Sequence, residues 1–519
     1  MFSFPWWLSL LIGFLSLSEE ILWVRVVGFA YRTLPIAFSF VLACYLVGIA
    51  AGAAYGKRLC ARSSNLYAAA AVVLAIAAVG DALTPAFTGL VVARHPANDL
   101  LLFTVAIVLA AALKSILFPI AHHLGSLSQG PAVGRSVSRI YFGNIIGATL
   151  GPLVTGFVAL DYLSADECFA LIAAICLLIS MMCVLRSQRP RYFLAPLAAA
   201  LLAYPFILQA ARPGPGLLRS FATGSEAMTY FSANRHGVVH TARTDSGDYV
   251  FGGNVYDGIA AVDVDRNPNL LDRVYLLALL NPNARRVLIV GMSAGAWTRA
   301  VQGFPGVETI DVVEINPAYV GLTQQYPELT AVLHDPRIHI HIDDGRRWLK
   351  RNPDARYDLI IQNTTYHWRN NAGNLLSEEY LRNVRQHMNP GAVLTTNTTG
   401  SFDVLATMAA VFPYAYRYAN FGYASDRELQ PDLHFLGGIR RPDGGFFGTT
   451  GTQGSVVALL AGAHLEAAGS FIARHPGADA QVITDDNLIS EYRHGMRFGP
   501  SLLKALQPRP APEFKIGEP

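Results

Sequence analysis

Three groups of residues in the second half of the chain have the types and spacing of a nucleotide-binding site. Gly291-Met-Ser-Ala-Gly295 follows the apolar run 287–290, and glycines in this pattern permit a tight turn and close backbone approach to a ligand. Glu314 follows about 20 residues later, where a carboxylate accepts hydrogen bonds from ribose hydroxyls. Asp343 and Asp344 end the next apolar run, where a carboxylate can accept from an adenine amino group, although Asp344 could instead cap a helix. These residues predict an adenosine-containing ligand.

Other chemistries have less support. The chain contains no Gly-x-x-x-x-Gly-Lys loop to cradle phosphates, which disfavours ATP chemistry. All five cysteines precede residue 184, so the second half offers no thiolate nucleophile and no sulfur ligand for a metal. His339 and His341 alternate along one strand without a partner at metal-ligand spacing. We therefore expect no metal site.

The elements that must position these residues alternate between apolar strands and helices from residue 286 onward. Such alternation predicts a doubly wound, mostly parallel sheet, and therefore an α/β Rossmann-like domain. Short alternating runs within 228–262 predict a small antiparallel β-hairpin sheet before it, and 270–280 reads as a helix. The predicted strands of the larger sheet are 287–290, 310–314, 338–342, 359–362 and 392–396.

Charge is unevenly distributed along the 519 residues, of which 52% are hydrophobic and 15% are charged. Residues 1–211 contain 12 basic and 7 acidic residues, and the remainder contains 28 and 30. The first part is too apolar for an ordinary soluble domain, in which about a quarter of the residues are charged. The near balance of the second part argues against a nucleic-acid partner.

An α-helical multi-pass membrane domain is predicted for 1–211, because a span needs roughly 20 mostly apolar residues. The candidate at 66–92 is weak, with breaks expected near Gly80-Asp81 and Pro85. About seven segments qualify, at 4–30, 36–56, 66–92, 99–120, 140–161, 166–185 and 192–211.

Among the charged residues inside these segments, Glu19, Glu20, Arg25 and Lys114 are the most informative. Each is costly there and usually has a partner or a water-filled path. A structural pair such as Glu20 with Arg25 and a transport or proton-relay site are the two interpretations.

Basic residues in alternate loops, at 57–62, 135–139 and 186–191, are expected in the cytoplasm. With seven spans, the second half of the chain would then lie on the outer side of the membrane, away from a cytoplasmic cofactor. With one span fewer, the second half would lie in the cytoplasm. We expect a multi-pass protein of a cell inner membrane, with the side of the C-terminal domain open.

The predicted domains follow from these patterns. Residues 1–211 form the transmembrane domain, and a linker at 212–227 begins with Arg212-Pro-Gly-Pro-Gly216, which cannot continue a helix. A small β subdomain at 228–264 precedes the Rossmann-like domain at 265–519.

Five landmark sequences lie within roughly 230–420: Arg286-Val-Leu-Ile-Val-Gly-Met-Ser-Ala-Gly295, Val312-Val-Glu-Ile-Asn-Pro317, Ile342-Asp-Asp-Gly-Arg-Arg-Trp-Leu349, Tyr357-Asp-Leu-Ile-Ile361 and Asn374-Leu-Leu-Ser-Glu-Glu-Tyr380. Through them this range resembles the spermidine synthase (polyamine aminopropyltransferase) family, which has a class I methyltransferase-like Rossmann fold. The front half is similar to the membrane domain fused to some bacterial members, for example at Tyr141-Phe-Gly-Asn-Ile-Ile-Gly147. Thr484-Asp-Asp-Asn-Leu-Ile-Ser-Glu-Tyr492 is similar to a closing motif of those fused proteins.

The resemblance implies a transferase of polyamine biosynthesis that moves an aminopropyl group from decarboxylated S-adenosylmethionine to an amine. Both substrates are cations, so carboxylates must hold them and accept the proton that the amine loses. By this resemblance, Glu314 would bind ribose and Asp344 would bind adenine.

The family's catalytic acids are replaced. Ala294 stands where the family has an acid beside the aminopropyl arm, and Asn363 and Tyr366 stand where it has two acids after the fourth strand. Asn363 has no useful basicity. His367 is the alternative general base, or else a polar loop residue. The expected polar contacts to the acceptor, besides Tyr366, come from Tyr256, Asp257 and Asp272.

Three functions are therefore open. The first is a membrane-bound aminopropyltransferase-type enzyme with a divergent active site. The second is an S-adenosylmethionine-dependent methyltransferase acting on a membrane-associated acceptor, and the third is a non-catalytic transporter or sensor of polyamine or adenosine ligands. The expected partners are a lipid bilayer, a polyamine or other amine acceptor, and a second copy of the chain in a homodimer.

Overall fold

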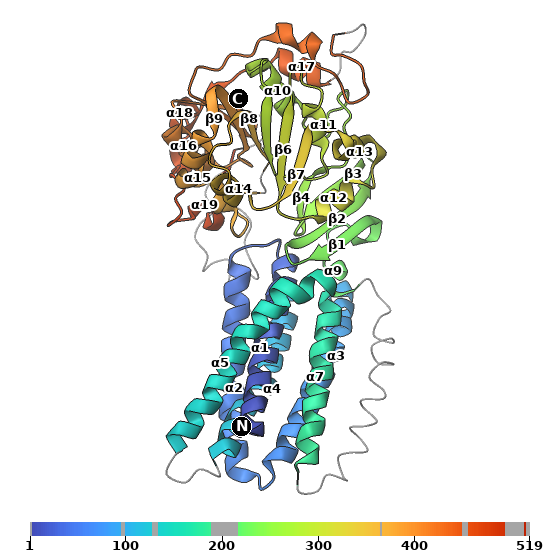
Figure 1. Cartoon of the computed structure of the whole chain (residues 1–519), viewed down its shortest axis with the longest axis vertical. Helices are drawn as coiled ribbons and strands as arrows, with labels where there is room; N and C mark the ends of the chain where they lie inside the picture. Colours follow the sequence, from blue (N-terminus) through green and yellow to red (C-terminus); the bar gives the residue numbers. More distant parts are fainter. Residues whose placement is uncertain are drawn as a thin grey trace. The chain divides into compact units, whose positions relative to one another are not determined.

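The structure of the chain is a computed structural model that divides into two units by its internal contacts. Figure 1 shows long helices in the first, helical unit and a sheet with helices in the second, α/β unit. The helical unit comprises Met1–Tyr31, Ile36–Ser225 and Ala233–Arg235, and the α/β unit comprises Arg32–Pro35, Glu226–Ser232 and His236–Pro519. The residues described are 3–94, 99–126, 133–187, 216–245, 247–363, 366–448, 455–493 and 513–514.

Long apolar helices make up most of the helical unit. Five helices are long and apolar enough to cross a membrane in the described part of the chain, within 36–62, 66–89, 100–126, 134–162 and 165–185. The helices are α1 (Phe4–Ala30), α2 (Ile36–Arg62), α3 (Leu66–Arg94), α4 (Asp99–Ser126), α5 (Val133–Val154), the π-helical turn η3 (Thr155–Ala159), α6 (Leu160–Tyr162), α7 (Ala165–Leu185), α9 (Leu217–Ser220) and η4 (Ser225–Ala227).

Glycines bring α2 against α4 and α5 against α1. A Cβ atom on Gly52 would lie 2.2 Å from the carbonyl oxygen of Ala112, and one on Gly147 would lie 1.9 Å from that of Leu10. Any larger side chain would therefore push these helices apart, as expected for apolar helices that associate through close backbone packing.

The predicted breaks in the third segment are wrong. α3 continues through Gly80-Asp81, and Pro85 lies inside the helix. The predicted segment 192–211 and the first four residues of the predicted linker, 212–215, lie outside the described residues.

The predicted pair of Glu20 with Arg25 is also wrong. Positions five apart on an α-helix point about 140° away from each other, so these side chains leave α1 in different directions. Among the described residues, Lys114 instead pairs with Glu19 and Asp81.

The α/β unit contains a small sheet with strand order β1-β2-β3-β4, as expected for 228–264. Its hairpins pair β2 with β3 and β3 with β4 in antiparallel register. The strands are β1 (Met228–Asn234), β2 (Gly237–Thr244), β3 (Gly247–Gly252) and β4 (Val255–Ile259).

The larger sheet has eight strands in the order β12-β10-β11-β9-β8-β5-β6-β7 within the described residues. β5, β6, β7, β8 and β9 pair in parallel, and β11, β10 and β12 extend the sheet in antiparallel pairs. The predicted α/β Rossmann-like fold of the methyltransferase-like class is confirmed. The strands are β5 (Arg286–Val290), β6 (Thr309–Glu314), β7 (Ile338–Ile342), β8 (Tyr357–Gln362), β9 (Met388–Asn397), β10 (Tyr414–Tyr418), β11 (Phe421–Ser425) and β12 (Glu466–Ala467).

Helices cover both faces of this sheet, and alternate residues of β5 face opposite sides. Val287 and Ile289 join the cluster around α10 and α11, whereas Leu288 and Val290 join the cluster around α14, α15 and α16. The helices are α10 (Asp272–Leu280), α11 (Ala296–Val301), α12 (Ala318–Thr323), α13 (Pro327–His334), α14 (Gly345–Arg351), η5 (Ala372–Leu375), α15 (Glu378–Gln386), α16 (Phe402–Val411), η6 (Leu433–Gly438), α17 (Ser455–Ala461), α18 (Ala468–Ala473), η7 (Pro476–Ala478) and α19 (Ile489–Tyr492).

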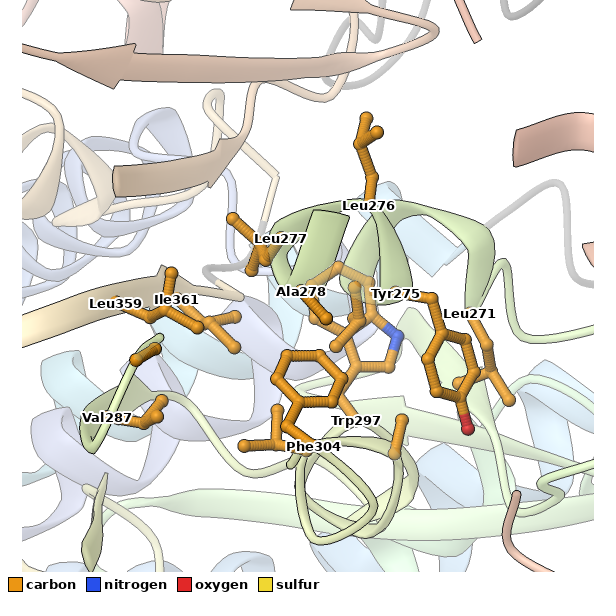
Figure 2. Packing of buried hydrophobic residues seen from close by; sticks show 14 of the residues in the cluster. Leu271, Tyr275, Leu276, Leu277, Ala278, Val287, Trp297, Phe304, Leu359 and Ile361 are labelled. Carbon is orange, nitrogen blue, oxygen red and sulfur yellow. The ribbon is translucent and has the colours of Figure 1, made fainter. Parts of the chain in front are cut away.

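The first of these clusters anchors the element that precedes β5. Figure 2 shows Leu277 and Ala278 of α10 gathered with Val287 and with Leu359 and Ile361 of β8. Because the five residues are at most 3% exposed, β5 and β8 pack closely against α10.

Candidate active site

The strand order defines a switch point at β5. The chain leaves β5 toward β6 and β7 on one side, then crosses to β8 on the other, and ligands of doubly wound sheets bind outside the carboxyl ends at such a point. Gly291 follows β5 with φ +90°, and a Cβ there would lie 2.4 Å from the carbonyl oxygen of Asn363, which follows β8. Only glycine fits this crossing point of the two loops.

Glu314, the last residue of β6, is bound to the turn after β5. Its Oε2 accepts from the backbone N–H of Met292 and its Oε1 from that of Asn316, both at 2.8 Å. Burial raises the pKa of Glu314 to about 7, the two N–H groups oppose this, and the nearby charge of Asp257 adds to it. Each carboxylate oxygen can accept a second bond, so the predicted ribose contact is compatible with this geometry.

Asp343 and Asp344 lie at the carboxyl end of β7. Asp344 is the N-cap of α14, where its Oδ1 accepts from the backbone N–H of Arg347 at 2.8 Å. Asp343 pairs with Arg347 and, at 3.3 Å, with Arg351. Burial alone would raise the pKa of Asp343, but the bonds from Arg347 and from the N–H of Asp344 outweigh it and hold the pKa below its usual value. Asp344 therefore has the helix-capping role that was the alternative to adenine binding, and the two roles can coexist on one carboxylate.

Asp257 of β4 is the acid closest in character to a general base. Its Oδ2 accepts a 2.5 Å hydrogen bond from the hydroxyl of Tyr319, on α12, while Oδ1 accepts none from the described residues. Burial raises the pKa of Asp257 to about 6, against the opposing effects of the Tyr319 hydroxyl and the charge of Arg369. This side chain thus combines an open oxygen with a pKa close to neutrality.

Two glycines at the turn from β3 to β4, Gly252 at the end of β3 and Gly253 after it, make room for the neighbours of Asp257. A Cβ on Gly252 would lie 2.2 Å from the Tyr319 hydroxyl oxygen, and one on Gly253 would lie 2.5 Å from an Arg369 guanidinium nitrogen. The sequence Gly252-Gly253, which reads simply as a hairpin turn, is therefore what admits both side chains.

Tyr256 and Tyr366 complete the surroundings of Asp257. Burial raises the pKa of both phenols, and the negative charge of Asp257 raises it further in each case, so the three side chains interact electrostatically. Tyr256 is 38% exposed and packs edge-on against Tyr249 with 5.3 Å between ring centroids. The structure thus brings together three of the four residues expected to contact the acceptor.

Asp272, the fourth, lies in a different network. Its Oδ1 accepts from Asn267 at 2.5 Å and pairs with Arg273 at 3.3 Å, and its Oδ2 accepts from the Tyr418 hydroxyl at 3.0 Å. It is 2% exposed, and within the described ranges no interaction links it to Asp257. Its contacts are those of a residue that holds the start of α10.

Ala294 has an apolar environment. Its side chain is 1% exposed within a cluster that includes Val239, Val250, Ala260 and Leu322. A carboxylate at this position would be buried without a partner. The surroundings of Ala294 are therefore unsuited to an acidic side chain.

The two residues proposed from the loop after β8 differ in their partners. The Asn363 side chain makes no hydrogen bond in the part of the chain that the structure describes. His367 is 2% exposed, and its Nδ1 lies 2.6 Å from Thr399 Oγ1 and its Nε2 3.4 Å from Glu513 Oε1. Both ring nitrogens face other protein groups, which favours the structural role for His367.

Comparison with known proteins finds a similarity over part of the α/β unit. The family model described as spermine/spermidine synthase domain matches residues 274–411. Over this range the α/β unit is spermidine-synthase-like. The match contains Glu314, Asp344 and Asn363, whereas Tyr256 and Asp257 precede it.

The similarity to characterised relatives of the spermidine-synthase-like unit is partial. The chain is 41% identical over 87 residues to a polyamine aminopropyltransferase of Agathobacter rectalis, covering 17% of this chain and 30% of that protein. It is 27% identical over 146 residues to a spermidine synthase of Solanum lycopersicum, covering 27% and 42%. Spermidine synthase of Thermotoga maritima aligns with 16% identity and a TM-score of 0.36 over 40% of this chain and 77% of that one. The chain thus spans less than half of the length of the two curated relatives, those of Agathobacter rectalis and Solanum lycopersicum.

Tyr319 and Arg369 are the site residues that sequence reasoning missed. Tyr319 comes five residues after Glu314 and Arg369 comes three residues after Tyr366, so both are close to predicted site residues in sequence. The pair Gly252-Gly253 was the one further signal, because a glycine pair can mark a close approach as well as a turn.

Proposed function

We propose that the chain is a membrane-bound aminopropyltransferase-type enzyme whose general base is Asp257. The observation that carries the proposal is the open oxygen of a partly buried Asp257 beside Tyr256 and Tyr366. The family match over 274–411 supports the reaction class, and the five apolar helices support a location in a cell inner membrane.

The proposed donor, decarboxylated S-adenosylmethionine, has an adenosine part and a cationic sulfonium. Glu314 at the end of β6 and Asp344 at the start of α14 would bind ribose and adenine, on the two strands beside β5. The sulfonium group would lie near the switch point, where Gly291 has no side chain to block the approach of a ligand to the backbone.

The acceptor would be a polyamine or another amine. Asp257 Oδ1 would accept a proton from the amine nitrogen, and this nitrogen would attack the aminopropyl carbon bonded to sulfur. The carbon–sulfur bond breaks with its electron pair on sulfur, which leaves a neutral thioether, methylthioadenosine. Tyr256 and Tyr366 offer aromatic faces that attract the cationic part of the amine.

A pKa of about 6 suits this role, because a base whose pKa lies just below the working pH is ionised and still accepts a proton efficiently. Arg369 and the Tyr319 hydroxyl oppose a further rise and keep Asp257 available as a carboxylate. Asn363 would serve only to orient the substrates, since an amide cannot take a proton.

The test is an assay of the full-length protein in detergent with decarboxylated S-adenosylmethionine and putrescine. We expect spermidine and methylthioadenosine, a kcat/KM that falls below pH about 6, and a loss of rate of about 10²- to 10⁴-fold in Asp257→Asn. Asp354→Asn, an exposed acid of the same unit, is the matched control. Absence of product with a series of amines, or an unchanged rate in Asp257→Asn, would contradict the proposal.

A second candidate is methyl transfer from S-adenosylmethionine to a membrane-associated acceptor. The apolar environment of Ala294 favours it, because an acid there would repel the carboxylate of the ordinary donor. Calorimetry with both donors separates the two functions: tighter binding of S-adenosylmethionine than of its decarboxylated form would support the methyltransferase.

A further inference from the structure

Three helices of the helical unit bring ionisable side chains together in its interior. Lys114 Nζ of α4 lies 2.6 Å from Glu19 Oε2 of α1 and 2.9 and 3.0 Å from the two carboxylate oxygens of Asp81 of α3. The side chains are 2%, 1% and 3% exposed, so solvent does not reach them.

The charges of this triad do not balance. Two carboxylates face one ammonium group, which leaves one negative charge in excess if both acids are ionised. An uncompensated charge in an apolar interior is so unfavourable that the group normally takes up a proton instead. The imbalance therefore calls for one additional positive charge.

The oxygen atoms of the triad are unequally used. Both oxygens of Asp81 accept hydrogen bonds from Lys114 and Glu19 Oε2 forms an ion pair with it, whereas Glu19 Oε1 is fully buried and has no hydrogen-bond partner among the described residues. Because the carboxyl groups of Glu19 and Asp81 both contact the same Lys114 Nζ, they lie close to each other. Two carboxyl groups can form a hydrogen bond only when one of them carries a proton.

Other polar groups near the triad do not supply the missing charge. The Tyr45 hydroxyl of α2 donates to the carbonyl oxygen of Ser16 at 2.8 Å and lies 3.4 Å from Glu19 Oε2. The thiol of Cys176 on α7 lies 4.0 Å from Asp81 Oδ2. Glu20 of α1, whose charge also acts on Tyr45, would add only a further negative charge.

We propose that Glu19, Asp81 and Lys114 form a buried proton-binding site, in which the two carboxyl groups share one proton beside the ammonium group. A metal cation fits the site poorly. Lys114 already occupies the position between the acids, and no group of three or more His, Cys, Asp or Glu side chains suited to a metal occurs among the described residues. The ligand is a single proton, and its loss would leave α1 and α3 with facing negative charges.

The site is independent of the proposed transfer reaction. It is built from α1, α3 and α4 alone and involves none of the residues around Asp257. The proton site could therefore exist in a protein without aminopropyltransferase activity, and the activity could exist without the proton site.

The test is infrared spectroscopy of the full-length protein in detergent at about pH 9, where Glu314, with a pKa of about 7, and Asp257, with a pKa of about 6, are ionised and give no protonated-carboxyl band. A protonated carboxyl group gives its own C=O stretching band, separate from that of carboxylates. We expect this band in the wild type and its loss in both Glu19→Gln and Asp81→Asn, because each variant leaves one carboxylate paired with one ammonium group. Glu20→Gln, the adjacent acid on α1, is the matched control and should keep the band.

Isotope labelling tests the same point without any substitution. Carboxyl-¹³C labelling of glutamate or of aspartate in the wild type should move the band, even if a variant fails to fold. A wild type without a protonated-carboxyl band, a band that survives both Glu19→Gln and Asp81→Asn, or a band that sodium ions abolish would overturn the proposal.

Discussion

The two units of the chain bury acidic side chains in opposite ways. In the helical unit, Glu19 and Asp81 close around Lys114, with all three side chains at most 3% exposed. In the α/β unit, Asp257 lies within β4 and accepts from a tyrosine hydroxyl, and Glu314 ends β6 and accepts from backbone N–H groups.

The difference separates a sealed ion cluster from a binding site. The sealed cluster brings its own cation, and a further charge enters only as a proton. Asp257 and Glu314 have no ion-pair partner within 4.0 Å among the described residues, so burial raises the pKa of both carboxyl groups. Such unpaired acids are typical of groups that act on a substrate.

Removal of the cation from the sealed cluster should have the largest effect. Lys114→Met leaves two buried carboxyl groups without a partner, and we expect a loss of about 3–5 kcal/mol in the free energy of unfolding. Thermal and denaturant unfolding in detergent measure it.

Lys57→Met, an exposed lysine at the end of α2, is the control for this prediction and should leave stability unchanged. The triple variant Lys114→Met, Glu19→Gln, Asp81→Asn should regain most of the loss, since no charge remains to be compensated. Equal losses in the single and triple variants would show that packing, rather than charge, is responsible.

The contribution of Glu314, at the end of β6, to stability should depend on pH in the opposite way to that of an ion-paired acid. The folded pKa of Glu314, about 7, exceeds its unfolded value, so its contribution is fully present below the unfolded pKa and is lost as pH rises through about 7. We expect the unliganded protein to lose up to about 3 kcal/mol from this group between pH 4 and pH 8. Unfolding measured across this range, with Glu314→Gln as the comparison, tests it.

Asp335 provides the contrast within the same unit. Its hydrogen bond from Arg337 holds the pKa at about 2, despite the opposing effect of burial. Its contribution is present above the unfolded pKa and is lost only as pH falls toward 2. Asp335→Asn should therefore leave the decline between pH 4 and pH 8 in place, and a flat profile in the wild type would contradict the prediction for Glu314.

Restoring the family's acid at the turn after β5 should have a moderate cost. Ala294→Asp places a larger polar group among Val239, Val250 and Leu322, and we expect a loss of about 2 kcal/mol without any gain in transfer rate. Ala294→Val adds volume without polarity and separates the two contributions. A higher transfer rate in Ala294→Asp would show that an acid can act at this position.

An exposed ion pair should show the smallest effect. Arg285 and Glu308 lie 3.0 Å apart but are 70% and 61% exposed, so solvent screens their attraction. Arg285→Ala should change the free energy of unfolding by less than about 0.5 kcal/mol at ordinary salt concentrations. If Arg285→Ala lowered the free energy of unfolding as much as Lys114→Met, burial could not explain why the two ion pairs differ in their contribution to stability.

Much of the fold is predictable because it depends on local periodicity. The apolar runs at 287–290, 310–314 and 338–342 have the length of buried parallel strands, and glycines mark the turns between elements. α3 shows the limit of this reasoning. Asp81 and Pro85 signal a break locally, yet pairing with Lys114 on another helix provides a partner that no local pattern reveals.

The candidate site divides in the same way. Glu314 and Asp344 could be placed from their positions after strands, because topology aligns the carboxyl ends of parallel strands. Tyr319 could not, since its bond to Asp257 joins residues 62 positions apart and depends on how α12 packs against the small sheet.

The sequence by itself determined three things: an apolar first part followed by a more polar second part, the order of strands and helices, and the acids suited to binding adenosine. Each of these follows from residue types repeated at helical or strand spacing, or placed at a strand end. Only the tertiary structure decided that Lys114 faces both Glu19 and Asp81, and that Tyr319 and Arg369 meet at Asp257. Charge compensation and pKa depend on distances between elements, and those distances arise only when the elements pack.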